Sequence, residues 1–487
     1  MLSRRELLVL VSAFVLSLPA VTPRIYASDE IQYFSYLRSL WFDRDVSFEN
    51  EYRYFFDRNI GRGEGFHATF LNQHTEAGRR PSFATIGSAI LWSPFYAAAD
   101  LVTRIGGGPA DGFSRAYVAG AAYGSAFYGF AAILLSIAAA RRLAGPGLLA
   151  GVIVWLGTPL LFYMYVSPPY SHACSAFAVA LFVTVWLKVR DRWTVGGAIA
   201  LGLSGALMAM VREQDVFLAL GPAVDFVLSA LRNGRAGLSR DEAKGPIGSA
   251  RGPSAARSRR ARASGGGAPR ALINADTVAP ALAGGFAFAV GLLPQLFAYK
   301  ALNGHFGPST LVTRKMNWQA PHALQVLASP EHGFFLWTPL AALAIAGLFV
   351  LAVGNRRADV RRIAWCAILM VALQIYVSGS VESWTVAGAF GQRRFVALTI
   401  MLTIGLAGLI AAVRRGAWQA VLGTALGLCV WWNLALIVEF GTGLMNRQRL
   451  EPGRNAYDAF VTLPRQLPSL AYRYFADRSS FYRQKPD

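Results

Sequence analysis

The sequence is poor in charged residues, and acidic residues are the scarcer kind. Only 15% of its 487 residues are charged and 54% are hydrophobic, which leaves too much apolar surface for soluble domains of ordinary size. There are 27 Asp and Glu against 47 Lys and Arg, a net charge of +20. The basic residues lie mainly in short connections between apolar runs. That arrangement indicates cytoplasmic loops of a membrane protein, and it argues against nucleic-acid binding.

Cysteine is also scarce, with three residues in the chain. Cys174 lies near the end of an apolar run, and Cys366 and Cys429 lie inside apolar runs. This placement argues against a disulfide framework, and their spacing fits no Cys-ligated metal site. The sequence also lacks a convincing internal repeat, a Gly-rich phosphate-binding loop and a Ser-His-Asp motif. These absences remove several common classes of soluble enzyme.

Long apolar runs are abundant. A helix needs about 17 to 25 apolar residues to cross the roughly 30 Å hydrocarbon layer of a bilayer. We therefore predict an all-α, polytopic protein of a bacterial-type inner membrane with about 11 transmembrane helices. The predicted spans are 5–22, 114–140, 146–164, 171–188, 194–211, 215–231, 276–299, 334–353, 363–379, 395–413 and 418–439.

The start of the chain, "MLSRRELLVL", sets the predicted orientation. Two arginines precede the first span, so the positive-inside rule places the N-terminus in the cytoplasm and residues 23–81 outside. A cleaved signal peptide over residues 1–28 is the alternative, since "RIYAS" offers small residues after an apolar core. Arg24, between that core and the cleavage point, is unusual for a signal peptide and favours an uncleaved span.

The apolar segment 83–102 presents a second choice, because it contains Pro94 and Asp100. If it crossed the membrane, the basic stretch "ARRLAG" at 140–145 would face outward, against the charge rule. We favour a juxtamembrane or re-entrant segment on the outer side. Every later basic loop then becomes cytoplasmic.

Four regions follow from these assignments. Residues 1–231 form a first transmembrane module, 276–439 a second one, and 440–487 an outer C-terminal tail. Between the modules, residues 232–275 are rich in Gly, Ala, Ser and Arg and have few large apolar groups. Such a stretch predicts a disordered, basic cytoplasmic linker, and attraction to anionic inner-leaflet lipids is an additional role for it.

The first outer loop holds the densest acidic cluster of the chain, in "YASDEIQYFSYLRSLWFDRDVSFENEYRYF" at 26–55. Asp29 and Glu30 precede apolar residues at spacings of three and four, a pattern typical of an amphipathic helix on the membrane surface. Those apolar residues are Ile31, Phe34, Leu37, Leu40 and Trp41. A carboxylate there can accept a proton from a hydroxyl or hold a divalent cation against a phosphate. Helix capping is the simpler alternative.

A second acidic pair, Asp43 and Asp45, could do similar chemistry in the same loop. Asp and Asn favour turns, so turn formation and loop bracing are the more ordinary roles for this pair. Asp43 and Asp45 are therefore substrate-site candidates of lower rank than Asp29 and Glu30.

Outward basic residues are exceptions to the charge rule and require an explanation. In "GQRRF", Arg393 and Arg394 begin a span from the outer side. The planar guanidinium suits a phosphate group, so these two arginines are candidates for binding one. Anchoring to lipid headgroups is the alternative.

Three further side chains are candidates for a substrate site. His172 in "SPPYSH" lies at the outer mouth of a span, and Arg212 in "VREQD" either pairs with Asp215 or contacts substrate. His332 lies in the loop 300–333 with two other histidines, whose spacing matches no local metal motif. The metal requirement therefore stays open, with a divalent cation as the only cofactor considered.

The order of these motifs resembles that of the GT-C superfamily. An Asp-Glu pair directly after the first span is followed by "YLRSLWFDRDVSFENEY" and then by "IGSAILWSPFY", and the likeness is best over residues 1–230. These membrane glycosyltransferases include the protein O-mannosyltransferases and the lipid A aminoarabinose transferase. The resemblance implies a polyprenyl-phosphate-linked sugar donor, with Asp29 or Glu30 as catalytic base. It also implies a late basic residue at the donor phosphate, here Arg393 or Arg394.

The sequence departs from the family in "SPPYSH", where His172 stands in place of an acid found in some relatives. The expected function is transfer of a hexosyl or pentosyl group to a glycan, lipid or protein acceptor on the outer face. A lipid-carrier flippase or transporter and a noncatalytic envelope protein are the alternatives. Transporters tend to keep ionisable groups near the midplane of the membrane, whereas these acids cluster at the outer surface, which favours the enzyme.

Overall fold

The computed structural model describes residues 2–61, 64–243, 275–386, 388–414 and 416–482. Within them the chain is helical, and its only β-type pairing is an isolated bridge between Met316 and Val381. Seven of the described helices are long and apolar enough to cross a membrane. The predicted all-α, membrane-embedded fold is confirmed at this level.

Each of the eleven predicted spans contains a helix. Three of the helices outside the seven, α7, α10 and α16, are apolar but shorter, and α1 is also short, with 14 residues. The helices are α1 (Arg4–Ser17), α6 (Arg115–Leu143), α7 (Gly147–Gly157), α9 (His172–Val189), α10 (Val195–Val211), α11 (Leu220–Ala243), α12 (Ala275–Asn303), α16 (Pro339–Gly354), α17 (Ala358–Ser380), α18 (Thr399–Ala412) and α19 (Gly416–Thr442).

Glycines allow several of these helices to approach closely. A Cβ at Gly202 of α10 would lie 2.1 Å from the carbonyl oxygen of Gly284 in α12. A Cβ at Gly347 of α16 would lie 1.9 Å from the carbonyl oxygen of Gly405 in α18. Lipid tails are as apolar as leucine, so helices in a membrane associate through such close backbone packing.

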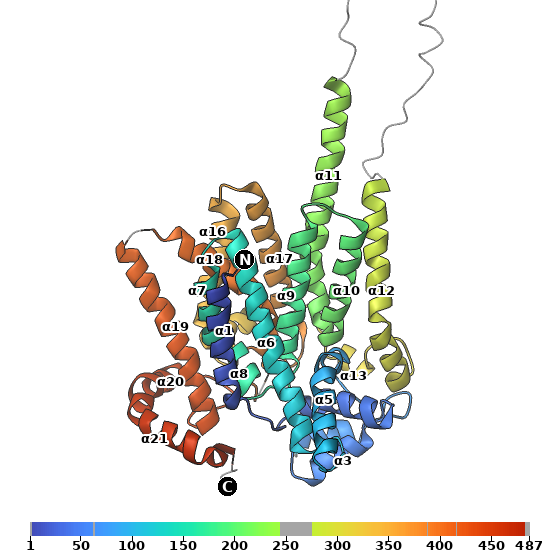
Figure 1. Cartoon of the computed structure of the whole chain (residues 1–487), viewed down its shortest axis with the longest axis vertical. Coiled ribbons are helices and arrows are strands. Elements are labelled where there is room, and N and C mark those ends of the chain that lie inside the picture. Colours follow the sequence, from blue (N-terminus) through green and yellow to red (C-terminus); the bar gives the residue numbers. More distant parts are fainter. Residues whose placement is uncertain (1, 62–63, 244–274, 387, 415, 483–487) are drawn as a thin grey trace, which may run out of the picture.

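Ion pairs gather α1, α6, α9, α11 and α17 on one side of the molecule, which we call the linker side. It is the upper side in Figure 1, where α11 ends and α12 begins. The opposite side, which holds the long connections, is the loop side. The linker-side pairs are Glu6 with Arg141, Arg142 with Asp191, and Asp225 with both Arg190 and Arg362.

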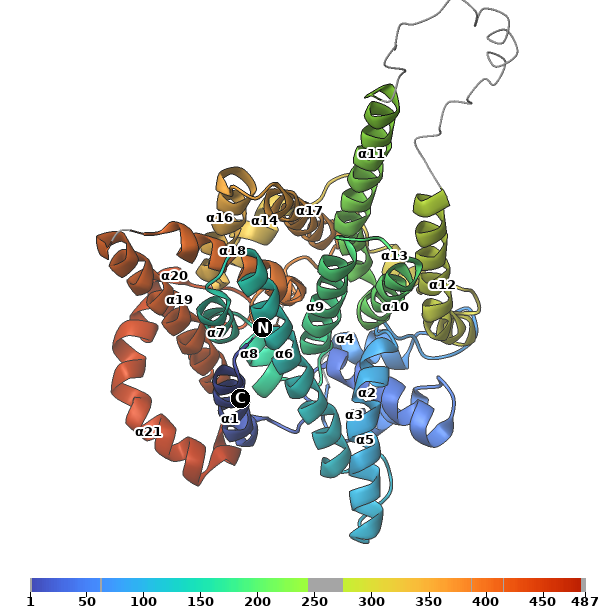
Figure 2. The same ribbon diagram turned by 45° about the horizontal axis from the view of Figure 1, so that its top comes forward.

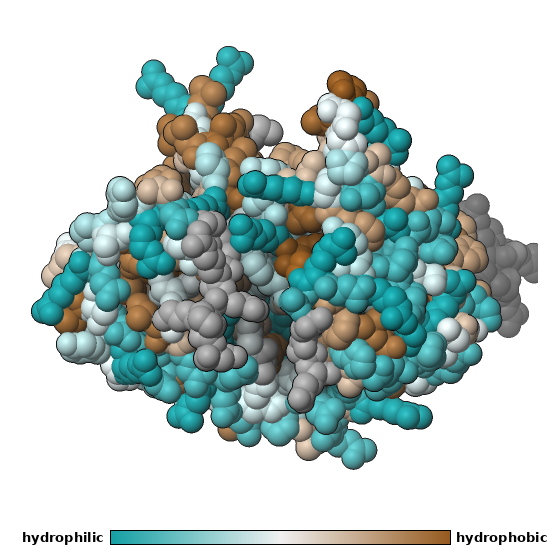
Figure 3. Space-filling view, turned by 90° about the horizontal axis from the view of Figure 1, so that it is seen from below, coloured by the Kyte–Doolittle hydropathy of each residue, from teal (hydrophilic) through white to brown (hydrophobic). Residues whose placement is uncertain are grey.

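The loop side is built from short helices (Figures 1 and 2). Seen face on, it is mostly hydrophilic, with hydrophobic side chains visible in a hollow near its centre (Figure 3). Its elements are α2 (Ser28–Arg38), η2 (Ser39–Asp43), α3 (Glu49–Asp57), α4 (Glu64–Phe66), η3 (His67–Leu71), α5 (Gly87–Ile105), α13 (Thr310–Thr313), α14 (Ala323–Ala328), α15 (Phe334–Trp337), α20 (Pro452–Tyr457), η6 (Asp458–Thr462), α21 (Leu463–Ala476) and η7 (Arg478–Tyr482). Four short segments complete the chain: η1 (Leu18–Ala20), α8 (Leu160–Tyr165), η4 (Glu213–Ala219) and η5 (Arg393–Leu398).

Helix α5 contains most of the segment predicted to be juxtamembrane or re-entrant. Its first residue, Gly87, meets the backbone of Val211 at the loop-side end of α10. It then packs along the first half of α6, where Trp92 Nε1 donates to Ser125 Oγ at 2.9 Å. Helix α5 therefore lies along the loop-side half of α6.

The apolar face predicted to meet the membrane in residues 29–41 is largely covered by protein, although Leu40 and Trp41 are exposed. In α2 the apolar residues Ile31 and Phe34 are buried, but against α3 and α5. Gln32 is buried as well and accepts a hydrogen bond from the Phe83 amide at 2.7 Å. The spacing identified the apolar face correctly, whereas the partner of that face is protein.

The first part of the predicted disordered linker is helical. Residues 232–243 continue α11 as a helix. Arg, Ala and Leu in this stretch are strong helix formers, which compensates for the scarcity of large apolar groups. The remainder of the predicted linker, 244–274, lies outside the described residues.

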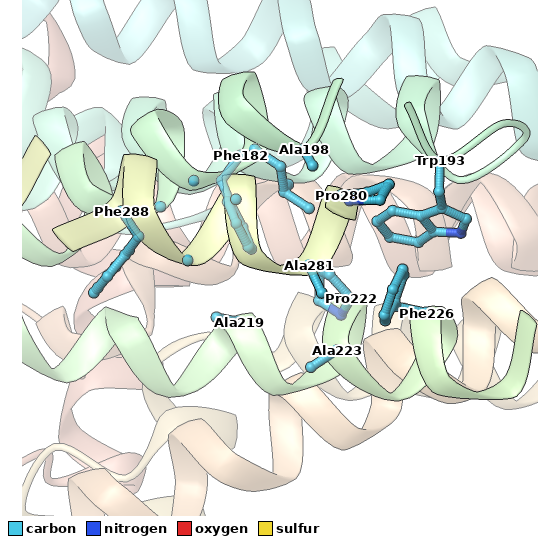
Figure 4. Close-up of a pocket in the computed structure, with 15 residues that line it drawn as sticks. Phe182, Trp193, Ala198, Ala219, Pro222, Ala223, Phe226, Pro280, Ala281 and Phe288 are labelled. Carbon is cyan, nitrogen blue, oxygen red and sulfur yellow. The ribbon is translucent and has the colours of Figure 1, made fainter. Parts of the chain in front are cut away.

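An apolar cavity of about 320 Å³ lies between α9, α10, α11 and α12 (Figure 4). Phe182 and Phe288 lie toward one end of it, and Trp193 and Phe226 toward the other. All of its lining residues are apolar, so this cavity offers no side chain for acid–base chemistry.

Candidate functional site

An ion pair on the loop side joins the first loop to the start of η5. A carboxylate oxygen of Asp29 lies 2.8 Å from a terminal guanidinium nitrogen of Arg393. The Asp29 side chain is 37% exposed and that of Arg393 is 18% exposed, so both are open to a ligand. The leading candidates for base and for phosphate binding, which are far apart in the sequence, thus lie together.

Two local features position these side chains. Asp29 is in the first turn of α2, where the helix dipole favours a carboxylate. Gly391, just before Arg393, has φ +59, and a Cβ there would lie 2.8 Å from Pro159, so only glycine fits this turn. The Arg393 guanidinium then lies 5.3 Å from the centre of the Tyr170 ring.

Glu30 has a different environment from Asp29. It is fully buried and accepts hydrogen bonds from Ser167 Oγ at 2.5 Å and from the Tyr26 and Ala27 amides at 2.6 and 3.0 Å. Burial raises the pKa of the Glu30 carboxyl to about 7, although these hydrogen bonds oppose the rise. Glu30 therefore caps α2 and fastens it to the connection between α8 and α9.

The raised pKa of Glu30 predicts a pH-dependent stability. A carboxyl whose pKa rises from 4.5 to about 7 on folding stabilises the fold below pH 4.5, and that stabilisation is lost as the pH rises through 7. Glu30→Gln keeps the shape but cannot ionise. We expect its thermal unfolding midpoint to match the wild type at pH 5 and to exceed it at pH 8. Burial also raises the pKa of Glu51 to about 7. Glu51 titrates in the wild type and in Glu30→Gln alike, so it does not contribute to the difference between their unfolding midpoints.

Two more arginines surround the pair. Arg394 is buried and donates to the Ser383 carbonyl oxygen at 2.9 Å, and it interacts electrostatically with both Arg393 and Arg212. Burial raises the pKa of the Tyr33 hydroxyl, and the positive charge of Arg212 opposes that rise. Arg212 therefore lies near Tyr33, in the same group of side chains as Arg393 and Arg394. Three guanidinium groups thus share one site.

Arg212 does not form the predicted ion pair with Asp215. It donates to His172 Nδ1 at 2.6 Å, while a carboxylate oxygen of Asp215 accepts from Ser175 Oγ at 2.5 Å. Asp215 lies in the first turn of the next helical segment, η4, and its hydrogen bond with Ser175 joins that segment to α9. Arg212 therefore stays available to the site.

His172 contributes a hydrogen-bond donor. Because arginine only donates, Nδ1 of His172 accepts and Nε2 carries the proton. Its ring packs against those of Tyr163 and Tyr170, with centroids 4.5 and 5.5 Å away. Three buried atoms of this region have no hydrogen-bond partner among the described residues: His172 Nε2, Gln214 Nε2 and Asp215 Oδ1. Buried polar atoms require partners, so these fit a polar ligand or water.

His332 braces the loop that precedes Arg393. Its Nε2 donates to the Ala389 carbonyl oxygen at 2.8 Å, and its ring stacks on Trp337 with centroids 4.7 Å apart. Burial lowers the pKa of His332 to about 4, so the ring is neutral at physiological pH. Gln392 donates to the His332 carbonyl oxygen at 3.3 Å, which fixes the segment before Arg393.

Asp43 and Asp45 are both used within the first loop. Asp43 pairs with Arg38 and accepts from Asn50 Nδ2 at 2.8 Å. Asp45 accepts from Ser39 Oγ at 2.7 Å and from the Ser47 amide at 3.0 Å. These contacts are those of loop bracing.

Among the residues that the structure describes, no group of three or more His, Cys, Asp or Glu side chains is placed to hold a metal ion. The three cysteines are free. No residue of the site is therefore assigned to a divalent cation.

Tyr33 and Ser167 were not identified from the sequence. Tyr33 stands four residues after Asp29, so both lie on one face of α2, and that spacing was the available signal. The Ser167 contact with Glu30 joins two segments far apart in the chain, for which the sequence carried no signal.

Comparison with known proteins adds no further constraint. No protein-family model matches the chain, and no curated protein is detectably similar to it. Its function is therefore argued from the residues and geometry described above.

Proposed function

We propose that this chain is an integral membrane glycosyltransferase of the GT-C kind. It moves a sugar from a polyprenyl-phosphate donor to an acceptor hydroxyl on the outer face of the membrane. The observation that carries the proposal is the Asp29–Arg393 pair at the centre of a cluster of guanidinium groups. Such a pair offers a base and a phosphate-binding group a few ångströms apart.

The proposed reaction is an inverting displacement. Asp29 takes the proton of the acceptor hydroxyl, and that oxygen attacks the anomeric carbon of the donor sugar. The bond between the anomeric carbon and the phosphate oxygen breaks, and the phosphate leaves with the electron pair. Arg393 stabilises the added negative charge, as a preorganised cation can in a site shielded from water.

The ion pair describes the state without donor. Arg393 is partnered by Asp29 at 2.8 Å, so an arriving phosphate competes with the carboxylate for the guanidinium. The donor phosphate would thereby release Asp29 for its role as base. Arginine suits this exchange because its planar fork binds a carboxylate or a phosphate in the same geometry.

Charge balance supports an anionic ligand. Arg394 interacts electrostatically with Arg212 and Arg393, and the carboxylates that interact with these three guanidinium groups in the described part of the chain are Asp29 and Asp215. Arg394 is hydrogen-bonded to Ser383, so it acts on the ligand through its positive charge and not through a direct contact. Arg212 and His172 can donate hydrogen bonds to the ligand. A phosphodiester would reduce this excess positive charge.

The proposal includes eleven crossings, with the loop side facing outward. The short connections on the linker side carry arginine clusters at 141–142, 190–192 and 356–362, as expected for cytoplasmic loops. Glu6 of α1 pairs with Arg141 on that side, which supports a cytoplasmic N-terminus with α1 running outward.

Cysteine labelling in intact cells checks this topology. An impermeant thiol reagent should label Asp57→Cys, exposed on the loop side, but not Arg192→Cys, exposed on the linker side, until the cells are permeabilised. Ser254→Cys, outside the described residues, should behave as Arg192→Cys does. Labelling of Arg192→Cys in intact cells would reverse the orientation and remove the outward active site.

One observation favours a lipid-carrier flippase as a second candidate. The 3₁₀ segment η4 interrupts the path between α10 and α11 and holds Asp215 fully buried. Transporters place ionisable groups in such broken helices. If Asp215→Asn stops the transfer of a fluorescent polyprenyl phosphate across liposomes containing the protein, and Asp29→Asn does not, the flippase is the better description.

A further inference from the structure

Helix α21 touches the protein along a narrow face. Leu463 is buried, and Leu470 and Tyr474 are half-buried, at spacings of seven and four residues. Such spacings put the three side chains on one line along the helix. The other side chains of α21 are exposed, including large apolar ones.

The exposed side chains of α21 divide into two flanks. At 100° per residue, Leu467, Ala471 and Phe475 fall on one side of the line of contact, and Tyr472 falls opposite that line. Leu467, Tyr472 and Phe475 are 40%, 74% and 86% exposed. The opposite flank consists of Arg465, Gln466, Ser469 and Arg473, all exposed. One flank suits lipid and the other suits water.

The segment before α21 is attached to α19. Asn455 Nδ2 donates to the buried carboxylate of Glu439 at 2.6 Å, near the loop-side end of α19. Trp431 Nε1 donates to the Ala459 carbonyl oxygen at 3.1 Å, and Ala459 packs with Ala435. This attachment brings α20 and η6 alongside the loop-side part of α19.

The segment after α21 is attached to α1. Arg478 donates to the Pro19 carbonyl oxygen at 2.5 Å and to Thr22 Oγ1 at 3.0 Å. Both residues follow the loop-side end of α1. The two ends of α21 are fixed at the loop-side ends of membrane helices. The helix therefore lies on the loop side of the molecule, between α19 and α1, as Figures 1 and 2 show.

We infer that α21 is an interfacial helix, bound to the membrane surface on the loop side. Its apolar flank enters the boundary between headgroups and acyl chains, and its polar flank faces water. Tyr and Phe favour that depth, and a helix with separate apolar and polar flanks binds there in the plane of the membrane. The occupant is lipid because α19, to which the segment is attached, is a membrane-length apolar helix that leaves Val421 (57%) and Leu428 (50%) exposed.

Spin labels on the two flanks test this inference. Phe475→Cys and Gln466→Cys are made singly in a Cys429→Ser background, since Cys174 and Cys366 are buried, and the labelled proteins are placed in lipid nanodiscs. We expect the label at 475 to collide with oxygen, which concentrates in lipid, and the label at 466 with a water-soluble nickel complex. Both residues are exposed, so neither change opens a cavity in the core.

Two results would overturn the inference. Equal access of the nickel complex to both labels would place the apolar flank in water. Protection of the 475 label from both reagents, with spin–spin broadening, would place it against a second copy of the chain. The readout does not involve sugar transfer and therefore stands apart from the proposed function.

Discussion

Asp29→Asn is expected to insert and fold normally and to lose most sugar transfer. A positioned general base contributes about 100-fold to 10,000-fold to a rate, and asparagine removes it while keeping the size and much of the helix-capping ability of Asp29. Purified protein in nanodiscs would be given a panel of radiolabelled polyprenyl-phosphate sugars, with membrane extract as acceptor. Transfer of label to any acceptor is the readout.

The structure supplies matched controls for this variant. Asp57→Asn makes the same change at an exposed position of α3 and should leave transfer unchanged. Glu30→Gln should lose less than Asp29→Asn, because Glu30 is buried and occupied by Ser167 and two amides. Near-normal transfer by Asp29→Asn with a collapse in Glu30→Gln would move the base by one residue. Near-normal transfer by both variants would refute the catalytic role of this loop.

Arg393→Gln is expected to weaken donor binding. A hydrogen bond to a charged group contributes about 1.5 to 3 kcal/mol, or roughly 10-fold to 150-fold in affinity. The probe is polyprenyl monophosphate, which is the leaving group whichever sugar is transferred. The uncharged polyprenol serves as the comparison ligand. Wild type should bind the phosphate more tightly than the alcohol, and Arg393→Gln should lose most of that difference.

Two comparisons separate phosphate binding from general effects. Arg314→Gln removes an exposed positive charge at the end of α13 on the same side and should not alter binding. Asp29→Asn removes the carboxylate that competes for Arg393, so it should bind polyprenyl monophosphate as well as wild type or better. If Arg393→Gln bound the phosphate as tightly as wild type does, Arg393 would be a headgroup anchor.

Arg394 differs from Arg393 in a way that the sequence "GQRRF" does not reveal. Arg394 is buried and bonded to Ser383, whereas Arg393 is partly exposed and faces Asp29. The charge rule identified both residues, because outward arginines at a membrane helix require an explanation. Which of the two meets the ligand depends on the turn at Gly391, a tertiary feature.

The helices were predictable because long apolar runs have few other structures in a membrane. The surroundings of α2 were not, since the spacing of Ile31 and Phe34 shows that one face is apolar but not whether lipid or protein covers it. For the same reason, the sequence did not show that the two acidic residues of the Asp-Glu pair have different surroundings. Asp29 and Glu30 are equivalent in the sequence, and tertiary contacts distinguish them, since Arg393 pairs with Asp29 and Ser167 donates to Glu30.

The central claim is that this protein adds a sugar at the outer face with Asp29 as base. Its most direct test compares, by mass spectrometry, the envelope glycans and glycolipids of cells that lack the protein with those of cells given back either wild type or Asp29→Asn at equal abundance. The account predicts that one species loses the mass of a single sugar without the protein, regains it with wild type, and stays short with Asp29→Asn. An unchanged envelope, or full restoration by Asp29→Asn, would contradict it.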